Sequence, residues 1–83
     1  MKKRYEDGVV PQLNKEIRTE FAKQMREIRL RQNLTQQVLA DRVGTKKSNI
    51  SRMESGRYNP SLDFMVRVAD CMGQHISITL EEQ

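Results

Sequence analysis

The spacing of apolar residues predicts one long amphipathic helix near the start of the chain. Between residues 14 and 32, Ile17, Phe21, Met25 and Ile28 follow one another at intervals of four, four and three residues. This period places the four side chains on one face of a helix, with charged residues outside that face. We therefore expect a helix over residues 14–32.

Three shorter helices are predicted over residues 36–43, 46–54 and 62–72. Each follows a threonine or serine, whose side-chain oxygen can accept a hydrogen bond from a free N–H of the first turn. Each is followed by a glycine, which readily adopts the left-handed conformation at a helix end. The capping residues are Thr35, Thr45 and Ser61, and the terminating glycines are Gly44, Gly56 and Gly73.

The pattern changes after Gly73, where Ile76, Ile78 and Leu80 alternate with polar residues. A period of two residues is typical of a half-buried strand. We therefore predict a compact all-α domain of four or five helices with one short C-terminal β-strand. The predicted parts are a flexible basic arm over residues 1–13, a helical domain over 14–73, and a strand with an acidic tail over 74–83.

Charge is unevenly distributed along the chain. Residues 1–33 carry a balance of +4, residues 34–60 of +3 and residues 61–83 of −3. A chain that is basic over most of its length and acidic at one end favours a polyanionic partner such as nucleic acid.

The rare residue types argue against several classes of protein. Cys71 and His75 are the only cysteine and histidine, so we expect neither an internal disulfide nor a metal site. The sequence has no nucleophile–base pair and no phosphate-binding glycine loop, so we expect no enzyme activity and no cofactor. No apolar run approaches the roughly 20 residues of a membrane helix, so we expect a cytoplasmic protein without a membrane partner.

The predicted helix over residues 46–54 presents two contrasting faces. Ile50 and Met53 are spaced to point inward, against the preceding helix. The opposite face carries hydrogen-bonding groups and cations but no acid, which suits a helix that enters the major groove of DNA. An ordinary solvated helix face is the alternative interpretation. The outward residues are Lys47, Ser48, Ser51 and Arg52.

A longer set of residues, spread over positions 22–73, resembles the lambda-repressor-like (Cro/CI, XRE) helix-turn-helix family. The resemblance implies a DNA-binding domain in which Arg29 and Glu54 form a partly buried salt bridge. The residues that carry it are Leu34-Thr35-Gln36, Leu39-Ala40, Val43-Gly44, Ile50-Ser51-Arg52, Glu54, Gly56 and Asn59-Pro60-Ser61-Leu62.

The resemblance also implies roles in DNA recognition for individual residues. The positions that match base-reading residues are Lys47, Ser48 and Arg52. The residues expected to contact the DNA backbone are Thr35, Gln36, Lys46, Asn49, Ser51, Arg57 and Tyr58.

We expect a homodimer that binds a palindromic operator in double-stranded DNA. The fourth helix is apolar around most of its circumference, and a lone strand needs a pairing partner. The simplest function is an autoregulatory transcriptional repressor. The alternative is an antitoxin, similar to HipB-like and HigA-like proteins, that also binds a toxin protein. The expected interface residues are Phe64, Val68, Cys71, Ile76, Ile78 and Leu80.

Overall fold

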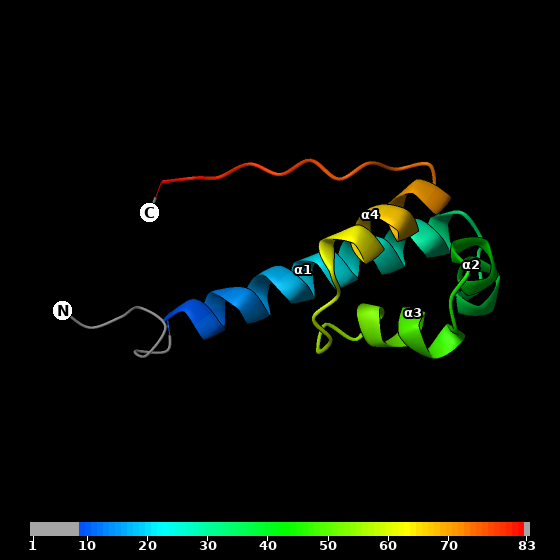
Figure 1. Ribbon diagram of the computed structural model, residues 1–83, viewed down its shortest axis with the longest axis horizontal. Helices are drawn as coiled ribbons and strands as arrows, with labels where there is room; N and C mark the ends of the chain where they lie inside the picture. Colours follow the sequence, from blue (N-terminus) through cyan, green and yellow to red (C-terminus); the bar gives the residue numbers. More distant parts are fainter. Residues whose placement is uncertain (1–8, 83) are drawn as a thin grey trace.

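The computed structural model describes residues 9–82 of the chain, with side chains from residue 12 onward. Over this range the fold is all-α, as predicted, and the short helices lie against the second half of the long first helix (Figure 1). The four helices are α1 (Val9–Arg31), α2 (Gln36–Val43), α3 (Lys47–Glu54) and α4 (Leu62–Cys71).

Helix α1 begins at Val9, five residues before the predicted start at residue 14. Pro11 does not prevent this, because a proline in the first turn removes an N–H that has no intrahelical partner. The predicted arm over residues 1–13 therefore extends too far, because residues 9–13 belong to α1. Residues 1–8 lie outside the described residues. The first turns of α1 project away from the other helices and make the domain elongated, with extents of 49 × 24 × 20 Å (Figure 1).

The helix ends follow the predicted signals at most positions. Helix α1 ends at Arg31, and Asn33 two residues later has a positive φ of 58°. The Thr35 side chain caps α2 by accepting a hydrogen bond from the backbone N–H of Val38 at 3.1 Å. Gly44 ends α2 in the left-handed conformation with φ 80°. Ser61 caps α4 in the same way as Thr35 caps α2, by accepting from the N–H of Phe64.

Thr45 does not cap α3, which corrects the prediction for that helix. The N-cap position is taken by Lys46, which makes no side-chain capping bond. The Thr45 hydroxyl oxygen instead accepts a hydrogen bond from Asn49 Nδ2 at 2.8 Å. Thr45 lies one residue before the cap position. Its hydroxyl oxygen therefore accepts a hydrogen bond from a side chain in the first turn of α3 and not from a backbone N–H.

The Thr35 cap gives a testable effect on stability. We expect Thr35→Ala to lower the free energy of unfolding by about 1 kcal/mol, because the N–H of Val38 loses its acceptor. Thermal denaturation measures this loss. Thr19→Ala is the matched control, because Thr19 is exposed within α1, where alanine is the better helix former. Equal losses in the two variants would contradict the capping assignment.

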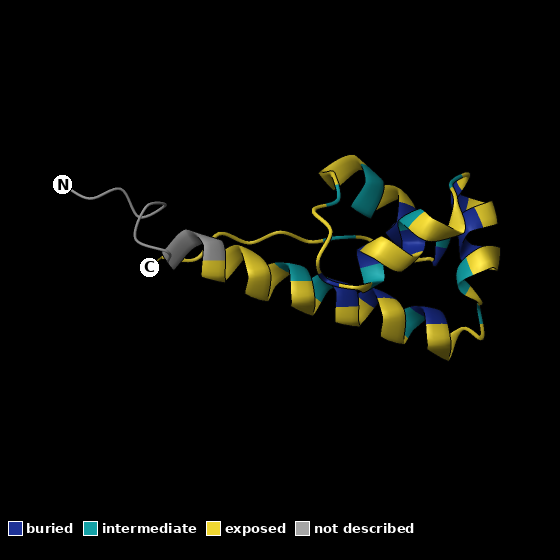
Figure 2. Cartoon of the chain, turned by 90° about the horizontal axis from the view of Figure 1, so that it is seen from below, coloured by how far each residue is buried: buried dark blue, intermediate teal, exposed yellow. Residues whose placement is uncertain are grey.

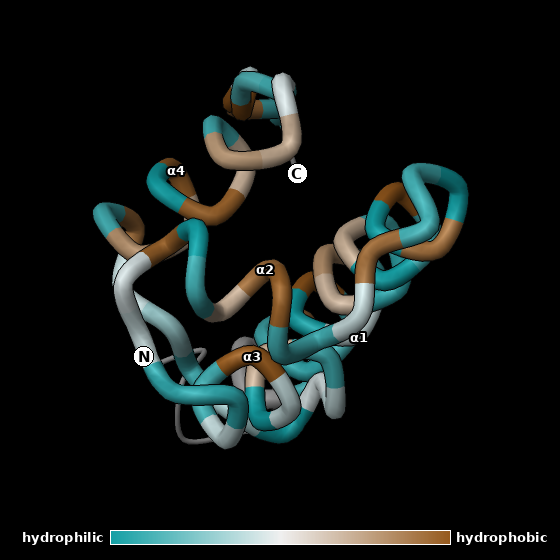
Figure 3. The backbone as a smooth tube through the Cα atoms, turned by 90° about the vertical axis from the view of Figure 1, so that its right-hand side faces the viewer, coloured by the Kyte–Doolittle hydropathy of each residue, from teal (hydrophilic) through white to brown (hydrophobic). Residues whose placement is uncertain are grey.

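The hydrophobic core lies where the second half of α1 meets α2, α3 and α4, and the first turns of α1 are exposed (Figure 2). Figure 3 shows that apolar and polar stretches share each helix, as expected for helices with one buried face. The predicted inward residues Ile50 and Met53 are buried, which confirms that part of the prediction. The buried apolar residues that form the core are Met25, Leu39, Ala40, Val43, Ile50, Met53, Val68, Ala69 and Met72.

The predicted dimer face of α4 needs correction. Val68 is completely buried within this single chain, so it is a core residue and not an exposed interface residue. Phe64 and Cys71 are half-buried and pack against the core. More than one side of α4 is covered, because α4 packs on α2 and because Met25 of α1 belongs to the same core. The exposed apolar residues of α4 are Leu62 and Val66.

The predicted C-terminal β-strand is absent from the described residues. Residues 74–82 carry no regular secondary structure. Ile76 packs partly against the core, whereas the Ile78 and Leu80 side chains are 66% and 94% exposed. The alternating pattern is real, but a strand also requires a neighbouring strand to pair with its backbone N–H and C=O groups. The described part of this chain supplies no such neighbour.

Candidate nucleic-acid interface

Helix α3 is held against the domain by its apolar face. Ile50 and Met53 are buried against a core to which α2 contributes Leu39 and Val43. This packing leaves the opposite face of α3 turned to solvent. The side chains of Lys47, Ser48, Ser51 and Arg52 are all exposed, in agreement with the predicted outward face.

The outward face of α3 has the electrostatic character that DNA requires. Lys47 and Arg52 supply two positive charges, and the exposed Lys46 adds a third immediately before the helix. The one acidic residue of α3, Glu54, is paired with Arg29 and lies in the protein interior. The exposed part of α3 is therefore purely cationic and hydrogen-bonding.

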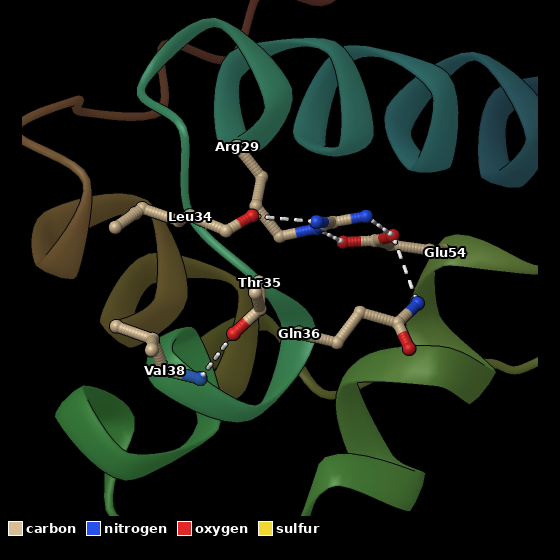
Figure 4. Close-up of polar contacts among 6 residues, drawn as sticks. All are labelled: Arg29, Leu34, Thr35, Gln36, Val38 and Glu54. Carbon is tan, nitrogen blue, oxygen red and sulfur yellow. Dashed lines mark hydrogen bonds and ion pairs between the residues drawn. The ribbon is translucent and has the colours of Figure 1, made fainter.

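The Arg29–Glu54 salt bridge joins α1 to the end of α3 (Figure 4). Arg29 Nε donates to Glu54 Oε2 at 2.7 Å, and Nη2 donates to Oε1 at 3.0 Å. A third bond runs from Nη1 to the carbonyl oxygen of Leu34 at 2.7 Å. The side chains are 8% and 3% exposed. The hydrogen bond to Glu54 raises the pKa of Arg29 above its usual value, so Arg29 stays protonated in this predicted pair.

Gln36 makes a contact that the sequence did not predict. Its Nε2 donates to Glu54 Oε1 at 3.2 Å, so the first residue of α2 is attached to the same carboxylate that Arg29 binds (Figure 4). An amide nitrogen has two hydrogens, so the second remains available to a ligand at the start of α2. The bond joins residues 18 positions apart, and no local pattern in the sequence signals such a contact.

An open hollow of about 490 Å³ lies beside the start of α2 and reaches the start of α3. Gln36 and Lys47 both line it, which places a predicted backbone contact beside a predicted base contact. The first N–H groups of α2 and the Lys47 ammonium together suit an anion. The lining residues are Arg29, Leu30, Asn33, Leu34, Thr35, Gln36, Gln37 and Lys47.

A second hollow of about 390 Å³ lies between α3 and the start of α4. Asn49 and Tyr58, both predicted to contact the DNA backbone, line this hollow. Arg67 of α4 also lines it and was not among the predicted contacts. The lining residues are Thr45, Asn49, Tyr58, Ser61, Asp63, Phe64 and Arg67.

All of the predicted DNA-contacting residues except Arg57 thus fall into three groups. The four residues of the outward face of α3 lie together, with Lys46 exposed just before them. Thr35 and Gln36 line the first hollow, and Asn49 and Tyr58 line the second. Arg57 is exposed in the loop that follows α3 and lines neither hollow.

The comparison with protein families agrees with this geometry. A family model described as helix-turn-helix matches residues 25–78, which include α2, α3 and the turn between them. The chain belongs to the helix-turn-helix family. It is a transcriptional regulator of the Cro/CI (XRE) type, a non-enzymatic class of DNA-binding proteins.

Characterised and uncharacterised members of this helix-turn-helix family resemble the chain. An uncharacterised HTH-type transcriptional regulator of Methanothermobacter thermautotrophicus is 45% identical over 53 residues, which are 63% of this chain and 77% of that protein. The competence pilus inhibition repressor of Acinetobacter baylyi is 37% identical over 65 residues, 75% of this chain and 59% of that protein. The HTH-type transcriptional activator BcrR of Enterococcus faecalis is 30% identical over 63 residues, 76% of this chain and 29% of that protein. No solved structure matches the chain.

Two further observations concern the described residues alone. No helix among them is both long enough and apolar enough to cross a membrane. Their histidine, cysteine and acidic side chains form no group of three or more that could hold a metal ion.

Proposed function

We propose that this helix-turn-helix protein binds a specific double-stranded DNA sequence by placing α3 in the major groove. The observation that carries the proposal is the outward face of α3, which is cationic and free of acid while its inner face is buried. Lys47, Ser48 and Arg52 read bases in this arrangement. Arg52 has the planar guanidinium that can bind guanine O6 and N7 together.

The two hollows support a role in holding the DNA backbone. Lys47 of α3 lines one hollow and Asn49 of α3 lines the other, and the sugar-phosphate strands border the major groove that α3 would occupy. A phosphate beside α2 would meet the free amide hydrogen of Gln36 and the N-terminal N–H groups of the helix. The proposed backbone contacts are Thr35, Gln36, Lys46, Asn49, Ser51, Arg57 and Tyr58.

The biological role we propose is autoregulatory repression by a homodimer on a palindromic operator. Repression needs only that the bound protein cover the promoter, and one relative, the Acinetobacter baylyi protein, is named a repressor. A two-fold dimer would set two copies of α3 one DNA turn apart, about 34–36 Å. The exposed Ile78 and Leu80 and the unpaired backbone after α4 support such an association.

The test is a titration of the protein against the DNA upstream of its own gene and against a scrambled fragment. We expect binding to the upstream DNA to be tighter by about a thousandfold. We also expect the logarithm of the affinity to fall steeply with the logarithm of salt concentration, because each neutralised phosphate releases counterions. Equal and weak binding to both fragments would contradict sequence-specific recognition.

The antitoxin alternative stays a prediction of the sequence. The names of the relatives describe regulators of transcription and mention no toxin. Autoregulatory repression uses the outward face of α3 and needs no toxin partner. It is the function that we propose.

A further inference from the structure

A pocket of about 270 Å³ lies between α1 and the start of α4. It shares no lining residue with the two hollows beside α3, so it is separate from the proposed DNA contacts. The segment between α3 and α4 passes α1 at this point (Figure 1). Asn59, Pro60 and Met65 form one wall of the pocket. The opposite wall comes from α1 and consists of Asn14, Ile17, Arg18 and Phe21.

The segment beside this pocket is anchored at both of its ends. At its start, Gly56 lies so close to α1 that a Cβ at this position would be 3.4 Å from Thr19 Cα. At its end, the Ser61 side chain caps α4 by accepting a hydrogen bond from the N–H of Phe64 at 3.0 Å. Pro60 lies between these anchors and has a fixed φ. The pocket is therefore already formed in the chain alone, as is usual for small-molecule sites.

Arg18 brings an unpaired hydrogen-bond donor to the pocket. Its Nε is buried and has no hydrogen-bond partner among the described residues. Arg29 on the same helix differs, because its guanidinium makes hydrogen bonds to Glu54 and to the carbonyl oxygen of Leu34. A buried donor on a charged group is costly to leave without an acceptor, and such donors are rare in folded proteins. The Arg18 Nε therefore points to a ligand that accepts a hydrogen bond.

The other lining residues define the chemical class of this ligand. Arg18 is the one charged side chain among the described residues that line the pocket, so the pocket favours an anion. A carboxylate suits an arginine particularly well, because its two oxygens can accept parallel hydrogen bonds from Nε and Nη. Most of the remaining lining is apolar, which suits a hydrocarbon chain. The volume lies just below the range of about 300–1,000 Å³ for typical ligand pockets, so the ligand is small.

We propose that this pocket binds a small aliphatic carboxylate. Arg18 Nε donates a hydrogen bond to the carboxylate, and the hydrocarbon chain of the ligand lies between Phe21 of α1 and Met65 of α4. The proposal goes beyond DNA recognition and does not depend on it, because the pocket and the outward face of α3 have no residue in common.

Octanoate is the probe for this site, and octanol and acetate are its matched controls. Octanol has the hydrocarbon chain without the carboxylate, and acetate has the carboxylate without the chain. In a titration followed by proton–nitrogen correlation NMR, we expect octanoate to shift the backbone amides of Ile17, Phe21 and Met65 until they saturate. Each control should bind at least about tenfold more weakly, because it lacks one of the two recognised groups. Equal affinity for octanoate and octanol, or no saturable shift at these amides, would overturn the proposal.

Arg18→Met tests the role of the guanidinium, because methionine is also unbranched and a good helix former but carries neither the donor nor the charge. We expect this variant to bind octanoate at least about tenfold more weakly than the wild-type chain and to bind octanol equally well. Arg26→Met is the matched control and should bind octanoate normally, because Arg26 is exposed on the same helix and does not line the pocket. Unchanged octanoate binding by Arg18→Met would contradict the assignment.

Thermal unfolding separates ligand recognition from a structural role of Arg18. Since its Nε has no partner among the described residues, Arg18→Met should unfold at or above the wild-type temperature when no ligand is present. Octanoate should raise the unfolding temperature of the wild-type chain more than that of Arg18→Met, because a ligand stabilises the state that binds it. A lower unfolding temperature of ligand-free Arg18→Met would make Arg18 a structural residue and overturn the site. These measurements contain no DNA, so their failure would leave the proposed function intact.

Discussion

Replacing Arg29 by alanine is expected to remove about 3–5 kcal/mol from the free energy of unfolding. The substitution deletes the three hydrogen bonds that the guanidinium makes to Glu54 and to the carbonyl oxygen of Leu34. Glu54 would remain buried, with Gln36 as its one remaining side-chain donor among the described residues. Losing one partner of a buried pair is costly because the other charge stays desolvated. Equilibrium urea unfolding measures the loss.

Two further variants test whether the loss comes from the ion pair. Arg26→Ala removes an exposed arginine from the same helix and should change stability by less than about 0.5 kcal/mol. The double variant Arg29→Ala/Glu54→Ala should lose less than the sum of the two single losses, because it leaves no unpaired buried charge. A loss below about 1 kcal/mol in Arg29→Ala would show that the pair is not a main support of the fold.

Arg52→Ala is expected to weaken operator binding by about 1–3 kcal/mol and to relax the preference at one base pair. Arg52 is exposed on the outward face of α3 and makes no side-chain hydrogen bond among the described residues, so its removal should leave the domain folded. Binding to a set of operators that each carry one altered base pair measures both effects. Loss of discrimination at a single position identifies the base that Arg52 reads.

Gln36→Ala provides the contrast with Arg52→Ala. Gln36 lines the hollow at the start of α2, where a phosphate would bind, so its loss should weaken all operator variants by a similar factor. Because Gln36 also donates to Glu54, binding should be measured well below the unfolding temperature of the variant. If the two variants weakened every DNA fragment alike, the assignment of base reading to Arg52 would be wrong.

Local sequence patterns determined the number of helices and most of their ends. The short helices lie almost where the apolar period and the capping residues predicted them, since Thr35, Ser61 and Gly44 act through bonds or conformations within a few residues. The inward and outward faces of α3 followed for the same reason, because helix geometry fixes which residues share a face. The motif residues between positions 22 and 73 then indicated the helix-turn-helix family and the Arg29–Glu54 pair.

Tertiary structure decided which apolar residues are covered. The period that placed Ile17 with Met25 on one face is correct, yet Met25 is buried and Ile17 is exposed, because the short helices cover only the second half of α1. Val68 was predicted to lie at an interface but is buried, because it lies where α4 faces the rest of the domain. A sequence pattern states that a side chain is apolar, whereas burial depends on what the fold places over it.

The same distinction explains the Gln36–Glu54 contact and the C-terminal segment. The contact joins residues far apart in sequence, so it required the packing of α2 against α3. The alternation of Ile76, Ile78 and Leu80 is a property of the sequence, but a strand exists only with a partner for its backbone groups. The sequence by itself determined the periodicities, the caps and the cationic face of α3. Only the tertiary structure determined which surfaces are satisfied within one chain, because hydrogen-bond partners and covering side chains come from distant segments.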